Sequence, residues 1–197
     1  MASFMYLWSN RAKFPLKSLS FYRAWAKRIL LLPSLFKSIR RNSYYRRRGS
    51  KVHEEAEIGE VNIEGKLNLL SIGAFSFLGK VEIALHDSVT IGNNVCINDD
   101  VVILTASHDV FDPNWAHKKA KIIIEDYVWI GTGAMILPGV RLGRGCVVGA
   151  RAVVSKSVEI GEIVVGNPAK KLQKKRLIDF KYNPCEFLAM NRAWLIG

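Results

Sequence analysis

An aliphatic side chain recurs at every sixth residue through the second half of the chain. The seven positions are Ile124, Ile130, Ile136, Leu142, Val148, Val154 and Ile160. The face of an α-helix repeats about every 3.6 residues and the face of a strand about every 2, so neither element explains this period. A small or β-branched residue also stands four places after each of the seven. The spacing therefore predicts short strands joined by turns and stacked into a solenoid with one continuous core.

The same register extends toward the N-terminus with less regularity. It includes Ile58, Ile72, Leu78, Leu85, Ile91, Ile97 and Ile103. After Ile103 the next aliphatic residue is due at position 109, which is Asp109, and the rhythm resumes only at Ile124. The fifteen extra residues are polar and aromatic and contain a proline, which predicts a projecting loop at 109–123. His108 is then the last regular position, on the edge of a coil beside that loop.

The run IGTGAMILPGVRLGRGCVVGARAVVSK and the closing VVGNPAKKL resemble the hexapeptide-repeat acyltransferases. In particular, they resemble the sugar O-acetyltransferases that include the maltose, galactoside and nodulation-factor enzymes, and this resemblance covers about residues 56–176. This resemblance implies an all-β fold, a left-handed parallel β-helix with three hexapeptides in each coil. It also implies a homotrimer with active sites between subunits and acetyl-CoA as the acyl donor.

His108 is the predicted catalytic residue. Acetyl transfer from a thioester to a hydroxyl needs a base, and an imidazole with a pKa of about 6.5 is largely neutral near pH 7. The resemblance matches His108 to the family's histidine in a T-x-x-H or S-H segment before the same type of loop. Asp109 could orient the ring or simply be exposed. His86 and His108 are 22 residues apart where a regular coil has 18, so we expect no metal site.

The resemblance also assigns the acetyl-CoA site, residue by residue. Trp129 matches the aromatic residue at the acetyl end, although alone it could be interface packing. Thr132 and Ala150 match positions along the pantetheine arm. The remaining matches lie along the adenosine end and are Ser155, Lys156, Pro168 and Lys170. Lysine suits phosphate binding, but a solvated surface is the alternative for each lysine alone.

The acceptor is less well defined, because the galactoside and maltose enzymes hold it with an Asn that aligns near Leu78 here. Candidate polar contacts are Asp87, Asn98, Asp99 and His117. We expect O-acetylation of a sugar or glycan in surface-polysaccharide or lipopolysaccharide synthesis. The alternatives are N-acetylation of an amino-sugar nucleotide and, in another class, a non-catalytic membrane-associated β-helix scaffold.

The net charge of +12 resides at the two ends of the chain. Residues 1–53 hold 13 Lys or Arg and no acid, whereas residues 54–169 carry a net charge of −6. Within residues 1–52 we predict a basic amphipathic helical extension, kinked or interrupted at Pro33. Its apolar stripe comprises Phe21, Trp25, Ile29, Leu32, Phe36 and Ile39. Residues 11–48 could contact a membrane surface or pack on the β-helix, and vesicle flotation would test the membrane contact. Nucleic acid is not an expected partner.

The chain thus divides into an extension (1–52), the β-helix (53–176) and a C-terminal tail with a short helix (177–197). In the tail, Asn183, Pro184 and Glu186 resemble the start of a helix that would cover an end of the solenoid. Three widely spaced cysteines without a metal or disulfide pattern favour a reducing compartment. We expect a cytoplasmic protein, with peripheral contact to the inner face of the cytoplasmic membrane left open.

Overall fold

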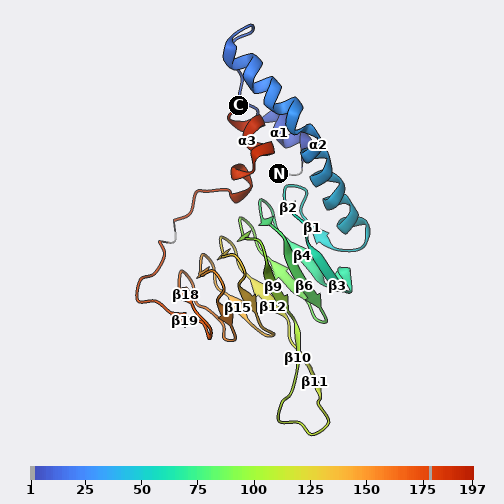
Figure 1. Cartoon of the computed structure of the whole chain (residues 1–197), viewed down its shortest axis with the longest axis vertical. Coiled ribbons are helices and arrows are strands. Elements are labelled where there is room, and N and C mark those ends of the chain that lie inside the picture. Colours follow the sequence, from blue (N-terminus) through green and yellow to red (C-terminus); the bar gives the residue numbers. More distant parts are fainter. Residues whose placement is uncertain (1–2, 178) are drawn as a thin grey trace.

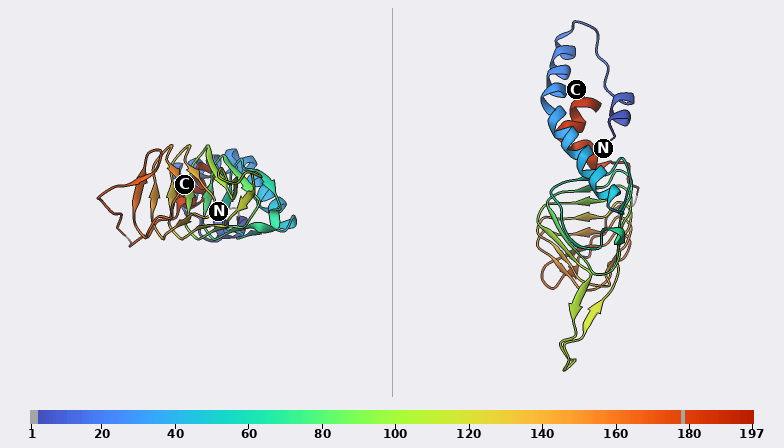
Figure 2. Two further views of the ribbon diagram at one scale, coloured as in Figure 1. Left: turned by 90° about the horizontal axis from the view of Figure 1, so that it is seen from below. Right: turned by 90° about the vertical axis from the view of Figure 1, so that its right-hand side faces the viewer.

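A computed structural model describes residues 3–177 and 179–197. The middle of the chain is a parallel β-helix, and helices from both ends of the chain pack together beside its first coils (Figure 1). A hairpin projects from the β-helix at the opposite end of the molecule from these helices, as Figure 2 also shows. The predicted solenoid of short strands is therefore confirmed.

Three sheets form the faces of the β-helix, named here in the order in which the chain crosses them. The first face contains β1 (Lys51–Val52), β4 (Leu70–Ile72), β7 (Val89–Ile91), β12 (Ile122–Ile124) and β15 (Arg141–Leu142). The second face contains β2 (Glu57–Ile58), β5 (Phe77–Leu78), β8 (Cys96–Ile97), β13 (Trp129–Ile130), β16 (Val147–Val148), β18 (Ile163–Val165) and the antiparallel β19 (Lys170–Lys171). The third face contains β3 (Asn62–Gly65), β6 (Val81–Leu85), β9 (Val101–Leu104), β14 (Met135–Ile136) and β17 (Val153–Val154).

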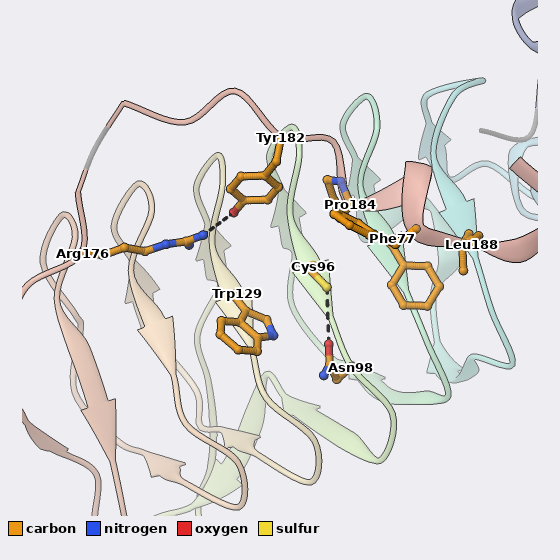
Figure 3. A pocket seen from close by; sticks show the side chains of 9 residues that line it. Phe77, Cys96, Asn98, Trp129, Arg176, Tyr182, Pro184 and Leu188 are labelled. Atoms are coloured by element: carbon orange, nitrogen blue, oxygen red, sulfur yellow. Dashed lines mark hydrogen bonds between the residues drawn. The ribbon is translucent and has the colours of Figure 1, made fainter. Parts of the chain in front are cut away.

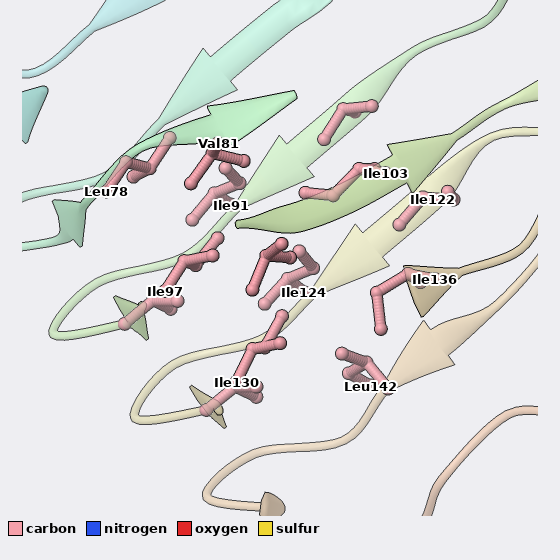
Figure 4. Close-up of a cluster of buried hydrophobic side chains, with 14 of the residues drawn as sticks. Leu78, Val81, Ile91, Ile97, Ile103, Ile122, Ile124, Ile130, Ile136 and Leu142 are labelled. Carbon is pink, nitrogen blue, oxygen red and sulfur yellow. The ribbon is translucent and has the colours of Figure 1, made fainter. Parts of the chain in front are cut away.

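The six-residue rhythm is the core of this β-helix. Ile124 pairs in register with Ile91 on one side and with Leu142 on the other. Ile130 likewise lies between Ile97 and Val148. Each aliphatic residue is thus stacked on its equivalent in the next coil, and the stacked side chains fill the interior (Figure 4). Burial of these side chains is the main source of stability for such a fold.

The rhythm fails at its last position, because the final coil is two residues shorter than the one before it. Val158 forms the bridge to Leu142 that a regular coil would give to Ile160. Val164 then pairs with Val148, 16 residues earlier instead of 18. Ile160 is consequently 49% exposed, and the prediction that it belongs to the core is wrong.

The insertion is a β-hairpin, not the predicted loop at 109–123. Strand β10 (Ala106–His108) pairs antiparallel with β11 (His117–Lys119), which satisfies backbone groups that an irregular loop would leave without partners. The insertion begins at Ala106, and Ile122–Ile124 already belong to the first face. His108 therefore lies on a hairpin that projects from this edge of the β-helix and not on the coil itself.

The N-terminal extension contains α1 (Phe4–Ser9) and α2 (Leu19–Arg47). Helix α2 continues through Pro33, which is on its exposed side, so the predicted interruption of the helix there is wrong. The predicted apolar stripe is also displaced, since Ile29 and Phe36 are 62% and 54% exposed. The buried residues of α2 are instead Ala24, Arg28, Leu35, Ser38, Asn42 and Tyr45.

Polar contacts fix these helices to the first coil and to the C-terminus. Arg28 is buried and donates to the carbonyl oxygens of Ala12, Ala193 and Trp194. The buried Glu57 accepts hydrogen bonds from Ser38 of α2 and from Asn191, at 3.0 Å for the latter. The sequence left open whether this extension contacts a membrane or packs on the β-helix. Packing on the β-helix is observed for the buried face of α2.

After β19 the chain returns alongside the β-helix toward the N-terminal helices as a strap, of which residues 174–177 and 179–188 are described (Figure 1). The predicted terminal helix is in two parts: a short 3₁₀-helix, η2 (Pro184–Phe187), and then α3 (Ala189–Leu195). Asn183 caps η2 as predicted, accepting a hydrogen bond from the Cys185 amide. Trp194 and Cys185 pack with Leu7 and Leu35 of the extension, so α3 covers the side of the first coils. A second 3₁₀-helix, η1 (Leu67–Leu69), precedes β4.

No helix within the described residues is both long enough and apolar enough to span a bilayer. The outward face of α2 nevertheless carries Leu19, Tyr22, Ile29, Leu30 and Phe36, each more than half exposed. Arg23, Lys27, Lys37 and Arg40 are exposed on the same helix. Contact of residues 11–48 with a membrane surface stays a prediction, now restricted to this outward face of α2.

Candidate functional site

His108 is held by a hydrogen bond that defines its protonated nitrogen. Its Nδ1 lies 2.7 Å from the carbonyl oxygen of Trp115, across the hairpin, and the two rings stack with centroids 5.0 Å apart. A carbonyl oxygen only accepts hydrogen bonds, so Nδ1 carries the proton and donates. The lone pair of the neutral ring is then on Nε2, which is the arrangement that a general base requires.

Asp109 does not orient this ring. Its carboxylate pairs with the Lys118 ammonium at 2.6 Å and accepts a hydrogen bond from the Phe111 amide at 3.1 Å. The hydrogen bond from Lys118 is the main reason that the pKa of Asp109 lies below its usual value. Asp109 thus stabilises the hairpin, and Trp115 supplies the orienting contact for His108.

Two further histidines adjoin His108. His117 is its partner in the hairpin register, with ring centroids 5.2 Å apart, and His86 lies 5.2 Å from His117. Desolvation, followed by the nearby Lys119 and the two other histidines, lowers the pKa of His117 and favours its neutral form. Among the described residues, no group of three or more His, Cys, Asp or Glu side chains is arranged to hold a metal ion.

Most of the residues predicted to bind acetyl-CoA or the acceptor lie on two edges of the β-helix. The third–first edge, where the chain turns from the third face to the first, includes residues 86–88, 106–121, 137–140 and 155–157. It carries His108, His117, Asp87, Ser155 and Lys156. The second–third edge includes residues 98–100, 131–134, 149–152 and 166–169 and carries Asn98, Asp99, Thr132, Ala150 and Pro168. Lys170 follows in β19, and Trp129 projects from the second face.

Thr132 and Ala150 are exposed neighbours on the second–third edge, where the Arg151 amide donates to the Thr132 carbonyl oxygen at 2.9 Å. Two acceptor candidates already have structural roles. Asp99 accepts a hydrogen bond from the Lys80 amide at 2.8 Å, and Asp87 accepts one from the Ser88 amide at 2.6 Å. Leu78, near which the resemblance placed an acceptor-binding Asn, is buried in the core. One chain therefore places Ser155 and Lys156 on the same edge as the predicted base. It separates the base from the other predicted acetyl-CoA residues, which are Trp129, Thr132, Ala150, Pro168 and Lys170.

Sequence reasoning missed a pocket of about 550 Å³ between the second face and the strap (Figure 3). Its lining residues are Phe77, Cys96, Asn98, Trp129, Arg176, Tyr182, Pro184, Phe187 and Leu188. The strap is positioned by Arg176, which donates to the Tyr127 carbonyl oxygen at 3.1 Å and to Tyr182 Oη at 2.8 Å. No local pattern could have predicted the pocket, because its two walls are far apart in the sequence.

Cys96 is a neutral part of the pocket wall. Burial raises the pKa of its thiol to about 11, so the reactive thiolate is scarce at neutral pH. The Cys96 Sγ donates weakly to Asn98 Oδ1 at 3.4 Å. Cys146 and Cys185 are free and buried, in agreement with the expectation of structural thiols.

Comparisons with known proteins agree with this fold. The family model described as "Bacterial transferase hexapeptide (six repeats)" matches residues 121–156. A galactoside O-acetyltransferase from Lactococcus lactis is 35% identical over 96 residues, which are 47% of this chain and 46% of that protein. A putative colanic acid biosynthesis acetyltransferase, WcaF of Escherichia coli, is 31% identical over 54% of this chain and 59% of its own length. The chain thus spans about half the length of the curated relatives it matches.

A solved structure matches over more of the chain. It is a hexapeptide-repeat-containing acetyltransferase from Vibrio cholerae, complexed with acetyl coenzyme A. The match has a TM-score of 0.65 at 25% sequence identity and covers 88% of this chain and 98% of that one. Since residues 53–197 make up less of the chain than this, the likeness includes at least part of the helical extension as well as the β-helix.

Proposed function

We propose that this hexapeptide-repeat chain is an acetyl-CoA-dependent acetyltransferase that modifies a hydroxyl group of a sugar in surface-polysaccharide or lipopolysaccharide synthesis. The hydrogen bond from His108 Nδ1 to the Trp115 carbonyl oxygen carries the proposal, because it leaves Nε2 available as a base. The named acetyltransferase relatives and the acetyl-CoA-bound neighbour support the donor. The galactoside and colanic acid relatives support a sugar acceptor.

In the proposed reaction, His108 Nε2 takes the proton of the acceptor hydroxyl as its oxygen attacks the thioester carbonyl carbon. The resulting tetrahedral intermediate collapses with cleavage of the carbon–sulfur bond. The imidazolium returns the proton to the departing thiolate, which leaves as the free thiol of CoA. Backbone amides near the carbonyl oxygen would stabilise the negative charge of the intermediate.

The acetyl-CoA residues have chemistry that suits their proposed roles. Thr132 and Ala150 form an exposed edge whose backbone groups can bind the amides of the pantetheine arm. Trp129 is 44% exposed, so its indole can pack against the acetyl end. Lys156 and Lys170 are exposed cations that can pair with phosphates.

We further propose that a second copy of the chain completes each site. His108 and the Thr132–Ala150 edge flank opposite sides of the third face, so a single chain separates base from donor. A ring in which the third–first edge of one copy meets the second–third edge of the next would join them. Three copies close such a head-to-tail ring in the proposed homotrimer.

Mixing two inactive variants tests this arrangement. Ala150→Trp should block the pantetheine arm and His108→Ala should remove the base, so we expect each variant alone to lose transfer. Copies unfolded together and refolded as a mixture should regain activity at least about tenfold above either parent, because some sites then combine two intact halves. Each variant refolded alone is the control. A mixture that stays as inactive as its parents would contradict a site shared between copies.

A further inference from the structure

The pocket under the strap has the properties of a ligand site. Two parts of one chain enclose it, and its volume of about 550 Å³ lies within the range of small-molecule pockets. Phe187 and Trp129, which line it, are 70% and 44% exposed. Exposed aromatic surface in a concave position is unfavourable in water and is stabilised when an apolar group covers it.

The lining favours an apolar group with a polar end. Phe77, Trp129, Pro184, Phe187 and Leu188 form most of the wall, and the Cys96 thiol beside them is neutral. None of the described residues that line the pocket is acidic. The polar groups are few, namely Asn98, Tyr182 and Arg176, which is typical of sites where a few polar contacts orient a largely apolar ligand.

Arg176 determines which polar end the pocket can accept. Two hydrogen bonds, to the Tyr127 carbonyl oxygen and to Tyr182 Oη, use only part of a guanidinium that has five N–H donors. Figure 3 shows Arg176 and Phe77 at opposite ends of the pocket, with Trp129 and Cys96 between them. A ligand with hydroxyl or phosphate oxygens near Arg176 could therefore extend its apolar part toward Phe77 and Leu188.

We propose that this pocket binds an apolar group attached to the sugar acceptor, such as an alkyl, prenyl or aryl substituent. The inference rests on the proposed function, since Trp129 is both a wall of this pocket and the proposed contact of the acetyl end. An acceptor held through its apolar substituent depends less on hydrogen bonds to the sugar.

Calorimetry with two soluble glycosides tests the proposal without any acetyl transfer. The full chain is titrated with methyl β-D-glucopyranoside and with octyl β-D-glucopyranoside below its micelle-forming concentration. Each methylene that enters the pocket should tighten binding by up to about fourfold, so we expect the octyl glycoside to bind at least about tenfold more tightly. Equal affinity for the two glycosides, or no binding of the octyl glycoside, would overturn the proposal.

Variants then locate the site. Phe187→Ser should weaken octyl glycoside binding by about tenfold, through the lost aromatic contact, and leave the methyl glycoside unchanged. Phe111→Ser is the matched control, because Phe111 is 92% exposed and lies on the hairpin, away from the strap. Circular dichroism verifies that both variants fold. If Phe187→Ser does not fold, the wild-type comparison still decides the question.

Further experiments distinguish the two sources of the apolar group and test the alternative that this surface is a contact between copies. Binding of 4-nitrophenyl β-D-glucopyranoside would indicate a free aryl glycoside, whereas recruitment only to vesicles that contain a long-chain alkyl glucoside would indicate a lipid-linked acceptor. If Phe187→Ser instead dissociates the oligomer and the wild type binds no glycoside, the surface is a contact between copies and the proposal is wrong. Acetyl-CoA binding, measured separately, keeps failure of this inference distinct from failure of the proposed function.

Discussion

Replacement of His108 by alanine is expected to lower kcat for acetyl transfer by about 10²- to 10⁴-fold, because a positioned base contributes about that factor. The imidazole is exposed on the hairpin, and its hydrogen bond to the Trp115 carbonyl oxygen is the only one it forms among the described residues. The substitution should therefore remove the base without unfolding the β-helix. Steady-state kinetics with a coloured thiol reagent measures the released CoA, and calorimetry measures acetyl-CoA binding, which should be retained.

The matched control is His53→Ala. His53 is an exposed histidine near the start of the β-helix, away from the hairpin, and its Nδ1 lies 3.5 Å from Glu55 Oε2. Its removal should leave kcat unchanged. A His108→Ala variant whose kcat stays within about tenfold of the wild type would contradict the assignment of the base.

Replacement of Ile130 by alanine should lower the free energy of unfolding by about 2–5 kcal/mol, the usual loss when a large side chain is deleted from a core. Ile130 is fully buried between Ile97 and Val148, so the cavity cannot collapse without moving neighbouring coils. The same substitution at Ile160, which is 49% exposed, should cost less than about 1 kcal/mol.

Urea denaturation of the two variants compares the free energies directly. The pair is informative because the six-residue spacing alone treats both isoleucines as equivalent. Equal destabilisation at the two positions would show that the final coil keeps the regular length, against the pairing of Val158 with Leu142.

The β-helix could be predicted from sequence because its core is a local pattern repeated many times. Every coil needs an inward aliphatic residue. The sequence therefore revealed the six-residue period, the fifteen-residue insertion and the strand register across that insertion. The shorter final coil was not, since Ile160 and Val158 are both aliphatic and only pairing distinguishes them. Likewise, the helical spacing of α2 allowed several apolar stripes, and packing against α1, η2 and α3 selected the one that includes Leu35.

The candidate site was predictable only in part, for a related reason. His108 stood out because it adjoins the break in the rhythm, yet its orienting partner is a backbone carbonyl at Trp115, which no side-chain pattern reveals. The strap pocket depends on Tyr182 and Phe187 meeting Phe77 and Trp129 across the second face. Contacts between segments so distant in sequence are specified by the folded chain as a whole.

Mass spectrometry of candidate sugars incubated with the chain and isotopically labelled acetyl-CoA tests the proposed acetyl transfer directly. We predict that a sugar gains the mass of one labelled acetyl group, that mild base removes this group as expected for an ester, and that the gain is absent with His108→Ala. A gain that resists base would indicate N-acetylation of an amino sugar. No gain on any sugar, together with no binding of acetyl-CoA, would contradict the account and favour a non-catalytic scaffold.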